Sequence, residues 1–217
     1  MAVITIERKV LEKNDAFAAQ NRQTFAEARL FAINVVSSPG AGKTSLLEQT
    51  IERLRGQLRL SVVEGDVQTD LDAQRVARYG APVVQIETNG GCHLEAKLVQ
   101  DALARLDLTA TDLLVIENVG NLVCPANYDL GEAMKVVLLS TTEGDDKPLK
   151  YPTIFHEADL CILNKIDLLP HVEFDAAKCR ENALRVNHHL EWFEVSAKTG
   201  EGLAVWQEWL EKRLANR

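Results

Sequence analysis

Residues 37–44, SSPGAGKT, have the composition of a loop that binds phosphate groups. An apolar segment precedes them and a helical pattern follows, which is the context that such a loop requires. Gly40 and Gly42 allow successive backbone N–H groups to face one anion, and the start of the helix adds partial positive charge. Lys43 is expected to reach the β- and γ-phosphates, and the Thr44 hydroxyl to bind Mg²⁺. The residues expected to bind the nucleotide here are Gly40, Ala41, Gly42, Lys43, Thr44 and Ser45.

Two later motifs indicate which base the nucleotide carries. NKID at residues 164–167 follows an apolar segment, and the Asp167 carboxylate can accept hydrogen bonds from the N1 and N2 donors of guanine, a pair that adenine lacks. Asn164 is expected to brace the loop and contact the base, with Lys165 lying along it. SAK at residues 196–198 resembles the second guanine loop of G-proteins, which adds Ser196, Ala197 and Lys198. Each motif follows a predicted strand, and ligands lie at the carboxyl ends of strands in open α/β sheets, so the motifs are expected to share one site. Since Asp167 suits guanine, this site is predicted to bind GTP rather than ATP.

Acidic residues at two further strand ends predict a magnesium and hydrolysis site. Asp66 ends the segment EGD, and Glu117 begins ENVG, in which Gly120 is expected to sense the γ-phosphate. With Lys43, Asp66 and Glu117 form the predicted catalytic set, and with Thr44 they form the predicted Mg²⁺ set. Asp70 and Asp72 are alternative groups for orienting water. No glutamine stands where a water-positioning glutamine is expected, so intrinsic hydrolysis should be slow.

Cys92 and His93 are adjacent and follow a glycine pair at a predicted helix start, which is expected to favour the thiolate. Cys124, close after Glu117, is the third candidate ligand. Thiolate and imidazole suit Ni²⁺ and Zn²⁺. Two copies of the chain, each contributing these three residues, could also share a site across a two-fold axis. Of the remaining cysteines, Cys161 is expected to be a core residue of a buried strand, and Cys179 a mid-helix residue that is either packed or exposed without a role.

Composition excludes several classes of function. The chain has 217 residues and a formal net charge of −8, which argues against a general nucleic-acid-binding surface. No apolar run reaches the roughly 20 residues that a membrane helix needs, and the first residues lack the apolar core of a secretory signal. Four cysteines are too few for a disulfide scaffold and fit a cytoplasmic location.

The order of apolar and helical segments predicts an α/β fold of the P-loop NTPase type, with a mostly parallel sheet covered by helices on both faces. An N-terminal helical arm over residues 1–30, with its helix at 3–30, precedes a GTPase domain over residues 31–217. Residues 141–151 form the longest expected loop, and Lys147 in it is a candidate to reach nucleotide charge. The predicted strands are 31–37, 60–64, 82–86, 112–117, 135–140, 159–163 and 192–195. The predicted helices of the domain are 43–55, 69–79, 93–105, 175–189 and 202–215.

Several stretches together resemble one family, the hydrogenase nickel-incorporation GTPases called HypB. They are SSPGAGKTSLL, EGDVQTDLDAQR, QIETNGGCHLEAK, LLVIENVGNLVCPANYDLGE, TEGDDKPLKYP and LNKIDLLP, and the likeness covers about residues 25–215. The resemblance implies a SIMIBI-class GTPase that dimerises with nucleotide or metal. It also implies delivery of nickel to [NiFe]-hydrogenase, metal binding by Cys92, His93 and Cys124, and two partners: a nickel-handling chaperone and the hydrogenase large subunit.

The chain departs from parts of the family pattern. Its first cysteine is Cys92 and its first histidine is His93, so it has neither the N-terminal cysteine motif nor the histidine-rich stretch of some members, and nickel storage is not expected. Lys97 stands where relatives can have a metal-binding histidine. Two alternatives stay open. One is a GTPase metallochaperone for another nickel or cobalamin enzyme, although urease-type relatives place proline between Cys and His. The other is a metal-buffering protein with a weak nucleotide site.

Overall fold

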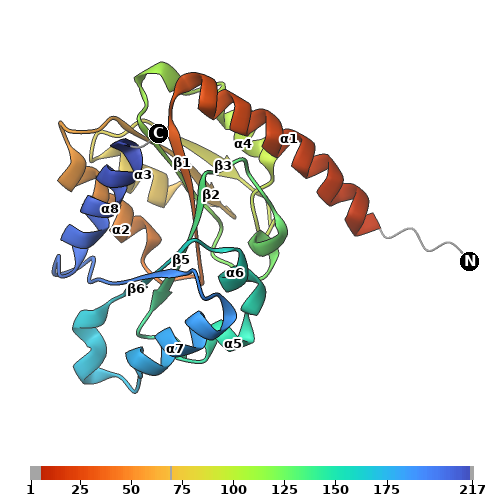
Figure 1. Ribbon diagram of the computed structural model, residues 1–217. Coiled ribbons are helices and arrows are strands. Elements are labelled where there is room, and N and C mark those ends of the chain that lie inside the picture. The colour runs from red at the N-terminus through yellow and green to blue at the C-terminus, as the bar shows by residue number, and fades with distance from the viewer. Residues whose placement is uncertain (1–5, 69, 216–217) are drawn as a thin grey trace, which may run out of the picture.

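The computed structural model describes residues 6–68 and 70–215, and within them seven parallel strands form one sheet in the order β3-β2-β4-β1-β5-β6-β7 (Figure 1). Each predicted strand is present, with ends that differ by no more than two residues, and the sheet is parallel throughout. The interior strands are almost wholly buried, as near-continuous apolar segments require when helices cover both faces. The strands are β1 (Phe31–Ser37), β2 (Leu60–Asp66), β3 (Val83–Glu87), β4 (Leu113–Glu117), β5 (Met134–Ser140), β6 (Leu160–Asn164) and β7 (Glu191–Glu194).

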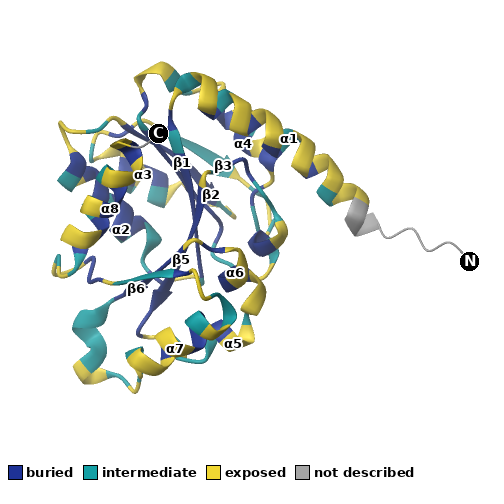
Figure 2. Ribbon diagram, viewed as in Figure 1, coloured by how far each residue is buried: buried dark blue, intermediate teal, exposed yellow. Residues whose placement is uncertain are grey.

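Helices pack on both faces of the sheet, which leaves the strands buried between them (Figure 2). One face carries α2 (Lys43–Leu54), α3 (Leu71–Ala77) and α8 (Leu203–Ala215), whose apolar side chains form one core with the sheet. The opposite side carries α1 (Ile6–Ala28), α4 (Ala96–Leu103), α5 (Lys147–Lys150), α6 (Pro152–Glu157) and α7 (Ala176–Val186). Short 3₁₀ helices are η1 (Leu108–Ala110), η2 (Cys124–Asn127) and η3 (Ile166–His171).

The N-terminal helix α1 lies along α4 and is joined to it by two buried asparagines (Figure 1). Asn14 Oδ1 accepts a hydrogen bond from Ala96 N at 2.9 Å, and Asn21 Nδ2 donates to Ala96 O at 2.8 Å. The first of these bonds satisfies the backbone N–H that begins α4, which explains why this helix starts at Ala96 and not at residue 93 as predicted. The helix α1 ends at Ala28 because Arg29 adopts a left-handed conformation with φ of 53°. Residues 1–5 of the predicted arm lie outside the described residues, as do residue 69 of the predicted helix 69–79 and residues 216–217 of the predicted domain.

Residues 141–151 are more ordered than a long loop, which corrects the sequence prediction. They contain the helical turn α5, in which Lys150 pairs with Asp146 at 2.7 Å. Asp145 of this segment pairs with Lys178 of α7 at 3.3 Å. These contacts hold the segment against α7, beside the phosphate loop.

Candidate functional site

The loop between β1 and α2 has the backbone conformation that phosphate binding requires. Gly40 and Gly42 both have positive φ, at 76° and 100°, and α2 begins directly afterwards at Lys43. A Cβ atom on Gly42 would lie 2.5 Å from Asn164 Nδ2, so no other residue fits there. Asn164 Nδ2 donates to Ala41 O at 2.9 Å, and Lys165 Nζ donates to Gly40 O at 2.7 Å. The first predicted base loop therefore braces the phosphate loop.

The two predicted base loops lie side by side. Ser196 Oγ donates to Asp167 Oδ1 at 2.6 Å, and Ala197 N donates to Asn164 Oδ1 at 3.0 Å. A pocket with a volume of about 370 Å³ lies between these loops and the phosphate loop, and its lining includes Gly42, Ser45, Asn164, Lys165, Asp167, Ala197 and Lys198. This volume is in the range of small-molecule sites. The structure thus brings together the residues that the sequence assigned to base and phosphate binding.

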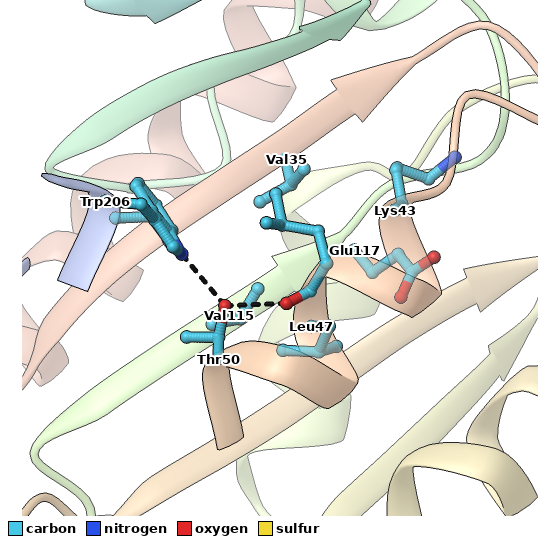
Figure 3. Close-up of a pocket in the computed structure, with 9 residues that line it drawn as sticks. Val35, Lys43, Leu47, Thr50, Val115, Glu117 and Trp206 are labelled. Atoms are coloured by element: carbon cyan, nitrogen blue, oxygen red, sulfur yellow. Dashed lines mark hydrogen bonds between the residues drawn. The ribbon is translucent and has the colours of Figure 1, made fainter. Parts of the chain in front are cut away.

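Lys43 and Glu117 lie in the buried part of the site. Lys43 Nζ donates to Ser37 Oγ at 3.0 Å, and Thr44 Oγ1 donates to Glu117 Oε1 at 2.9 Å. Beneath them a cavity of about 20 Å³ separates Lys43 and Glu117 from Trp206, with Val35, Leu47 and Val115 among its lining residues (Figure 3). Burial in these apolar surroundings lowers the pKa of Lys43 and raises the pKa of Glu117 to about 7.

Glu64 is a further site residue, which the sequence analysis passed over in favour of Asp66. It is opposite Glu117 in the register of β2 and β4, and the Oε2 atoms of both residues are buried without a hydrogen-bond partner. Burial, and then the neighbouring Glu117, raise the pKa of Glu64 to about 8. Carboxylate oxygens are hard donors of the kind that Mg²⁺ prefers, and the Glu117 carboxyl already contacts the Thr44 hydroxyl. The sequence signal was the two-residue spacing from Asp66, which puts both side chains on one face of the strand.

The other acidic candidates occupy the rim of the site. Asp66 ends β2, and its Oδ1 accepts from Val67 N at 2.6 Å. Asp72 pairs with Arg75 at 3.1 Å, while Asp70 precedes α3 without capping it through its side chain. Gly120 lies against the phosphate loop, since a Cβ atom there would be 3.0 Å from Pro39 Cα. This close approach places the glycine where a γ-phosphate sensor is expected.

The residues Cys92, His93 and Cys124 form a cluster whose potential metal-ligand atoms lie within 4.8 Å of one another. Cys92 is exposed, whereas His93 is half-buried and lies against the Tyr128 ring at a centroid distance of 3.9 Å. The His93 Nε2 atom is buried and has no hydrogen-bond partner. Burial lowers the pKa of His93, so the imidazole is held in the neutral form that binds metals. Three soft or borderline ligands leave room for a further ligand from a partner.

Two details of the predicted cluster need correction. The expected thiolate at Cys92 is wrong for the metal-free protein, because a hydrogen bond with the Cys124 thiol raises the pKa of Cys92. The helix that was expected to lower that pKa begins only at Ala96. Lys97, by contrast, pairs with Asp101 and lies 5.8 Å from the centroid of the Phe17 ring, so it is engaged by α1 and α4.

The other two cysteines are fully buried in the core between the sheet and α7, as predicted for Cys161, and Cys179 is packed and not exposed. Burial raises the pKa of the Cys161 thiol, and it raises the pKa of Cys179 to about 12. Both are therefore inert thiols at neutral pH.

The raised pKa of Glu64 predicts how stability depends on pH. The folded carboxyl keeps its proton up to about pH 8, while the unfolded one loses it near 4.5, so the free energy of unfolding falls as pH rises through this window. Between about pH 6 and pH 8 this contributes a loss of roughly 2 to 3 kcal/mol. Glu64→Gln should remove most of that loss. Urea denaturation of nucleotide-free protein in EDTA measures it, and equal losses in wild type and variant would contradict the assignment.

The strand order, the phosphate loop and the two loops beside it define a P-loop nucleotide-binding protein. Residues 31–194 match the family model described as the CobW/HypB/UreG nucleotide-binding domain. The chain belongs to the HypB family of hydrogenase maturation factors. It is 56% identical to the factor of Azotobacter vinelandii over 215 residues, covering 99% of this chain and 71% of that protein. It is 50% identical to the factor of Escherichia coli K12 over 209 residues, covering 96% and 72%.

Solved structures agree with this assignment. The crystal structure of HypB from Helicobacter pylori in complex with nickel has a TM-score of 0.90 at 39% identity and covers 94% of this chain and 96% of that one. HypB from Archaeoglobus fulgidus has a TM-score of 0.88, also at 39% identity, with coverage of 94% and 99%. Among the helices of the described residues, none has the length and apolar character needed to cross a membrane.

Proposed function

We propose that the chain is a GTP-hydrolysing metallochaperone that binds Ni(II) or Zn(II) and assists nickel insertion into [NiFe]-hydrogenase. The observation that carries this proposal is the position of Cys124, which lies on the same short segment as Glu117 and within 4.8 Å of the other two potential ligands. One segment therefore contacts both the nucleotide site and the metal cluster. The names of the relatives, and nickel in the Helicobacter pylori structure, support hydrogenase maturation and nickel as cargo.

The proposed roles at the nucleotide site are those that the sequence motifs predict, and the contacts of Asn164, Thr44 and Glu117 support them. Asp167 selects guanine, Asn164 braces the phosphate loop, and Lys43 meets the β- and γ-phosphates. Mg²⁺ is held by Thr44, Asp66 and Glu117, and it supplies charge neutralisation for the phosphate oxygens. Turnover is proposed to be slow, as in a GTPase of the SIMIBI class without a water-positioning glutamine.

Lys147 is proposed to reach the nucleotide, within its own protomer or across a dimer. Its Nζ donates to Ser38 Oγ of the phosphate loop at 3.3 Å and pairs with Glu143 at 3.2 Å. The Lys147 ammonium also lies 5.2 Å from the Tyr151 ring centroid. These contacts support a Lys147 ammonium that is fixed beside the phosphate loop, and they argue against a solvated side chain.

The assembly and its partners are also part of the proposal. A homodimer that depends on nucleotide or metal brings two clusters together, and the exposed Cys92 supports a site that a second chain completes. A nickel-handling chaperone and the hydrogenase large subunit are the proposed partners, in the cytoplasm. Residues 1–30 are proposed as an arm, and residues 31–217 as the GTPase domain.

Nickel titration of metal-free protein, with GDP and then with a non-hydrolysable GTP analogue, tests the proposal. A change in nickel affinity of about tenfold between the two nucleotides is expected, which corresponds to a coupling of about 1.4 kcal/mol. Size-exclusion chromatography with light scattering, run on the same samples, should show the dimer in one of the two states. Affinity that is the same with both nucleotides would contradict the proposal, and so would turnover of ATP at the rate of GTP.

A further inference from the structure

Two asparagines of segment 117–124 hold the backbone of the metal-binding turn at residues 92–94. Asn121 Nδ2 donates to Cys92 O at 3.1 Å. Leu94 N donates to Asn118 Oδ1 at 3.1 Å. The two bonds flank His93, so the turn is attached to the segment on both sides of this residue.

Both asparagine side chains also form hydrogen bonds to the backbone of segment 117–124, and Asn118 forms one to β1. Asn118 is buried, its Oδ1 accepts a second bond from Val119 N at 3.0 Å, and its Nδ2 donates to Asn34 Oδ1 at 3.2 Å. Asn121 Oδ1 accepts from Val123 N at 2.9 Å, directly before Cys124. Each side chain therefore binds its own segment and the metal-binding turn at once.

The same segment is in contact with the phosphate loop. Glu117 accepts from Thr44, and Gly120 lies against Pro39. Beyond Cys124 the chain is fixed to the sheet, because the buried Lys135 Nζ donates to Ala126 O at 3.3 Å. The two asparagines lie between these contacts, on the stretch that joins the phosphate loop to Cys124.

We infer that Asn118 and Asn121 are positioning residues that assemble Cys92, His93 and Cys124 into the tighter metal site in one nucleotide state. The inference rests on the proposed function. When the segment is displaced in the other state, the two bonds to residues 92–94 are lost and the ligands separate. The nucleotide then acts on the metal through these bonds and not through Cys124 alone.

Asn121→Ala is the primary test, because the Asn121 side chain is half-exposed and its loss leaves the core intact. The probe is nickel alone, titrated into protein with GDP or with a non-hydrolysable GTP analogue. Nickel affinity should fall in the tighter-binding state and stay unchanged in the weaker one, so a tenfold ratio between states should drop to about twofold or less. By reciprocity, nickel should lose its effect on nucleotide affinity by the same factor.

Three further variants separate positioning from general damage. Asn121→Asp keeps the acceptor for Val123 N but loses the donor to Cys92 O, so its ratio should fall as in Asn121→Ala. Asn118→Ala removes the bond to Leu94 N, on the other side of His93, and should also lower the ratio of nickel affinities between the two nucleotide states. Asn187→Ala is the matched control, since this half-buried asparagine after α7 also donates to a backbone oxygen, Ala158 O at 2.9 Å, and its ratio should be unchanged.

The outcomes distinguish this inference from the proposed function. If Asn121→Ala and Asn118→Ala keep the same ratio of nickel affinities as the wild type, the inference is overturned and the proposed function stands. Loss of the ratio in Asn187→Ala also overturns it, since general destabilisation would then explain the effect. A wild-type ratio of one overturns the proposed linkage and this inference together.

Discussion

Lys43→Ala is expected to abolish GTP hydrolysis, with a fall in single-turnover rate of roughly 10³-fold or more. The Lys43 ammonium is buried and donates to Ser37 Oγ, a neutral partner that a phosphate oxygen can replace. Burial lowers the pKa of Lys43, and the nearby Glu117 opposes this shift. Removing the ammonium takes away positive charge where negative charge develops in the transition state. Release of phosphate from excess enzyme over GTP measures the effect.

Lys212→Ala is the control for Lys43→Ala, because Lys212 is an exposed lysine of α8 that pairs with Glu208. Its hydrolysis rate should equal that of wild type. Nickel binding by nucleotide-free Lys43→Ala should also be normal, because no cluster residue contacts Lys43. Hydrolysis within threefold of wild type in Lys43→Ala would show that the phosphate loop has been assigned wrongly.

Cys92→Ala should weaken nickel binding by roughly 100-fold or more while hydrolysis without metal changes less than twofold. The substitution removes one of three ligand atoms that lie within 4.8 Å of one another and leaves an imidazole and one thiol. Two ligands are too few for a closed site. Competition against a chromophoric chelator measures the affinity, and phosphate release measures hydrolysis.

Cys179→Ala is the matched control for Cys92→Ala, since it removes a buried thiol that is not one of the three potential ligands and costs only core packing. Nickel affinity should be unaffected by it. Full nickel affinity in Cys92→Ala would mean that the metal binds elsewhere, and a parallel loss of hydrolysis would mean that the substitution disturbs the nucleotide site.

The strands and the phosphate loop were predictable because their signals are local. Seven apolar segments alternate with helical ones, and a glycine-rich turn joins β1 to the helix that begins at Lys43. The start of α4 was not predictable in this way, since Asn14 of α1 satisfies the backbone N–H of Ala96 across 82 positions of sequence. The same error produced the wrong expectation of a thiolate at Cys92.

The metal cluster was predictable only in part from the sequence. Cys92 and Cys124 follow strand ends, which predicts that they share one edge of the sheet, but the strand order is a tertiary property. The strands β3 and β4 are separated by β2, so the turn after β3 must cross the end of β2. It does so by placing Leu94 over Gly65, where a Cβ atom would lie 2.8 Å from Leu94 Cδ2. Glu64 was missed because its importance depends on its register with Glu117.

The strand order has a consequence for how members of this fold can diversify. The metal-binding turn and segment 117–124 follow strands on one side of β1, whereas the loops that contain Asn164 and Ser196 follow strands on the other side. The proposed metal site and the proposed base site thus lie on opposite halves of one sheet, while Glu117 and the phosphate loop lie between them. If the proposed sites hold, we expect that substitutions in the turn at residues 92–94 change the choice of metal without altering the choice of base. The pocket that binds the base can then stay unchanged in related proteins that deliver metal to a different enzyme.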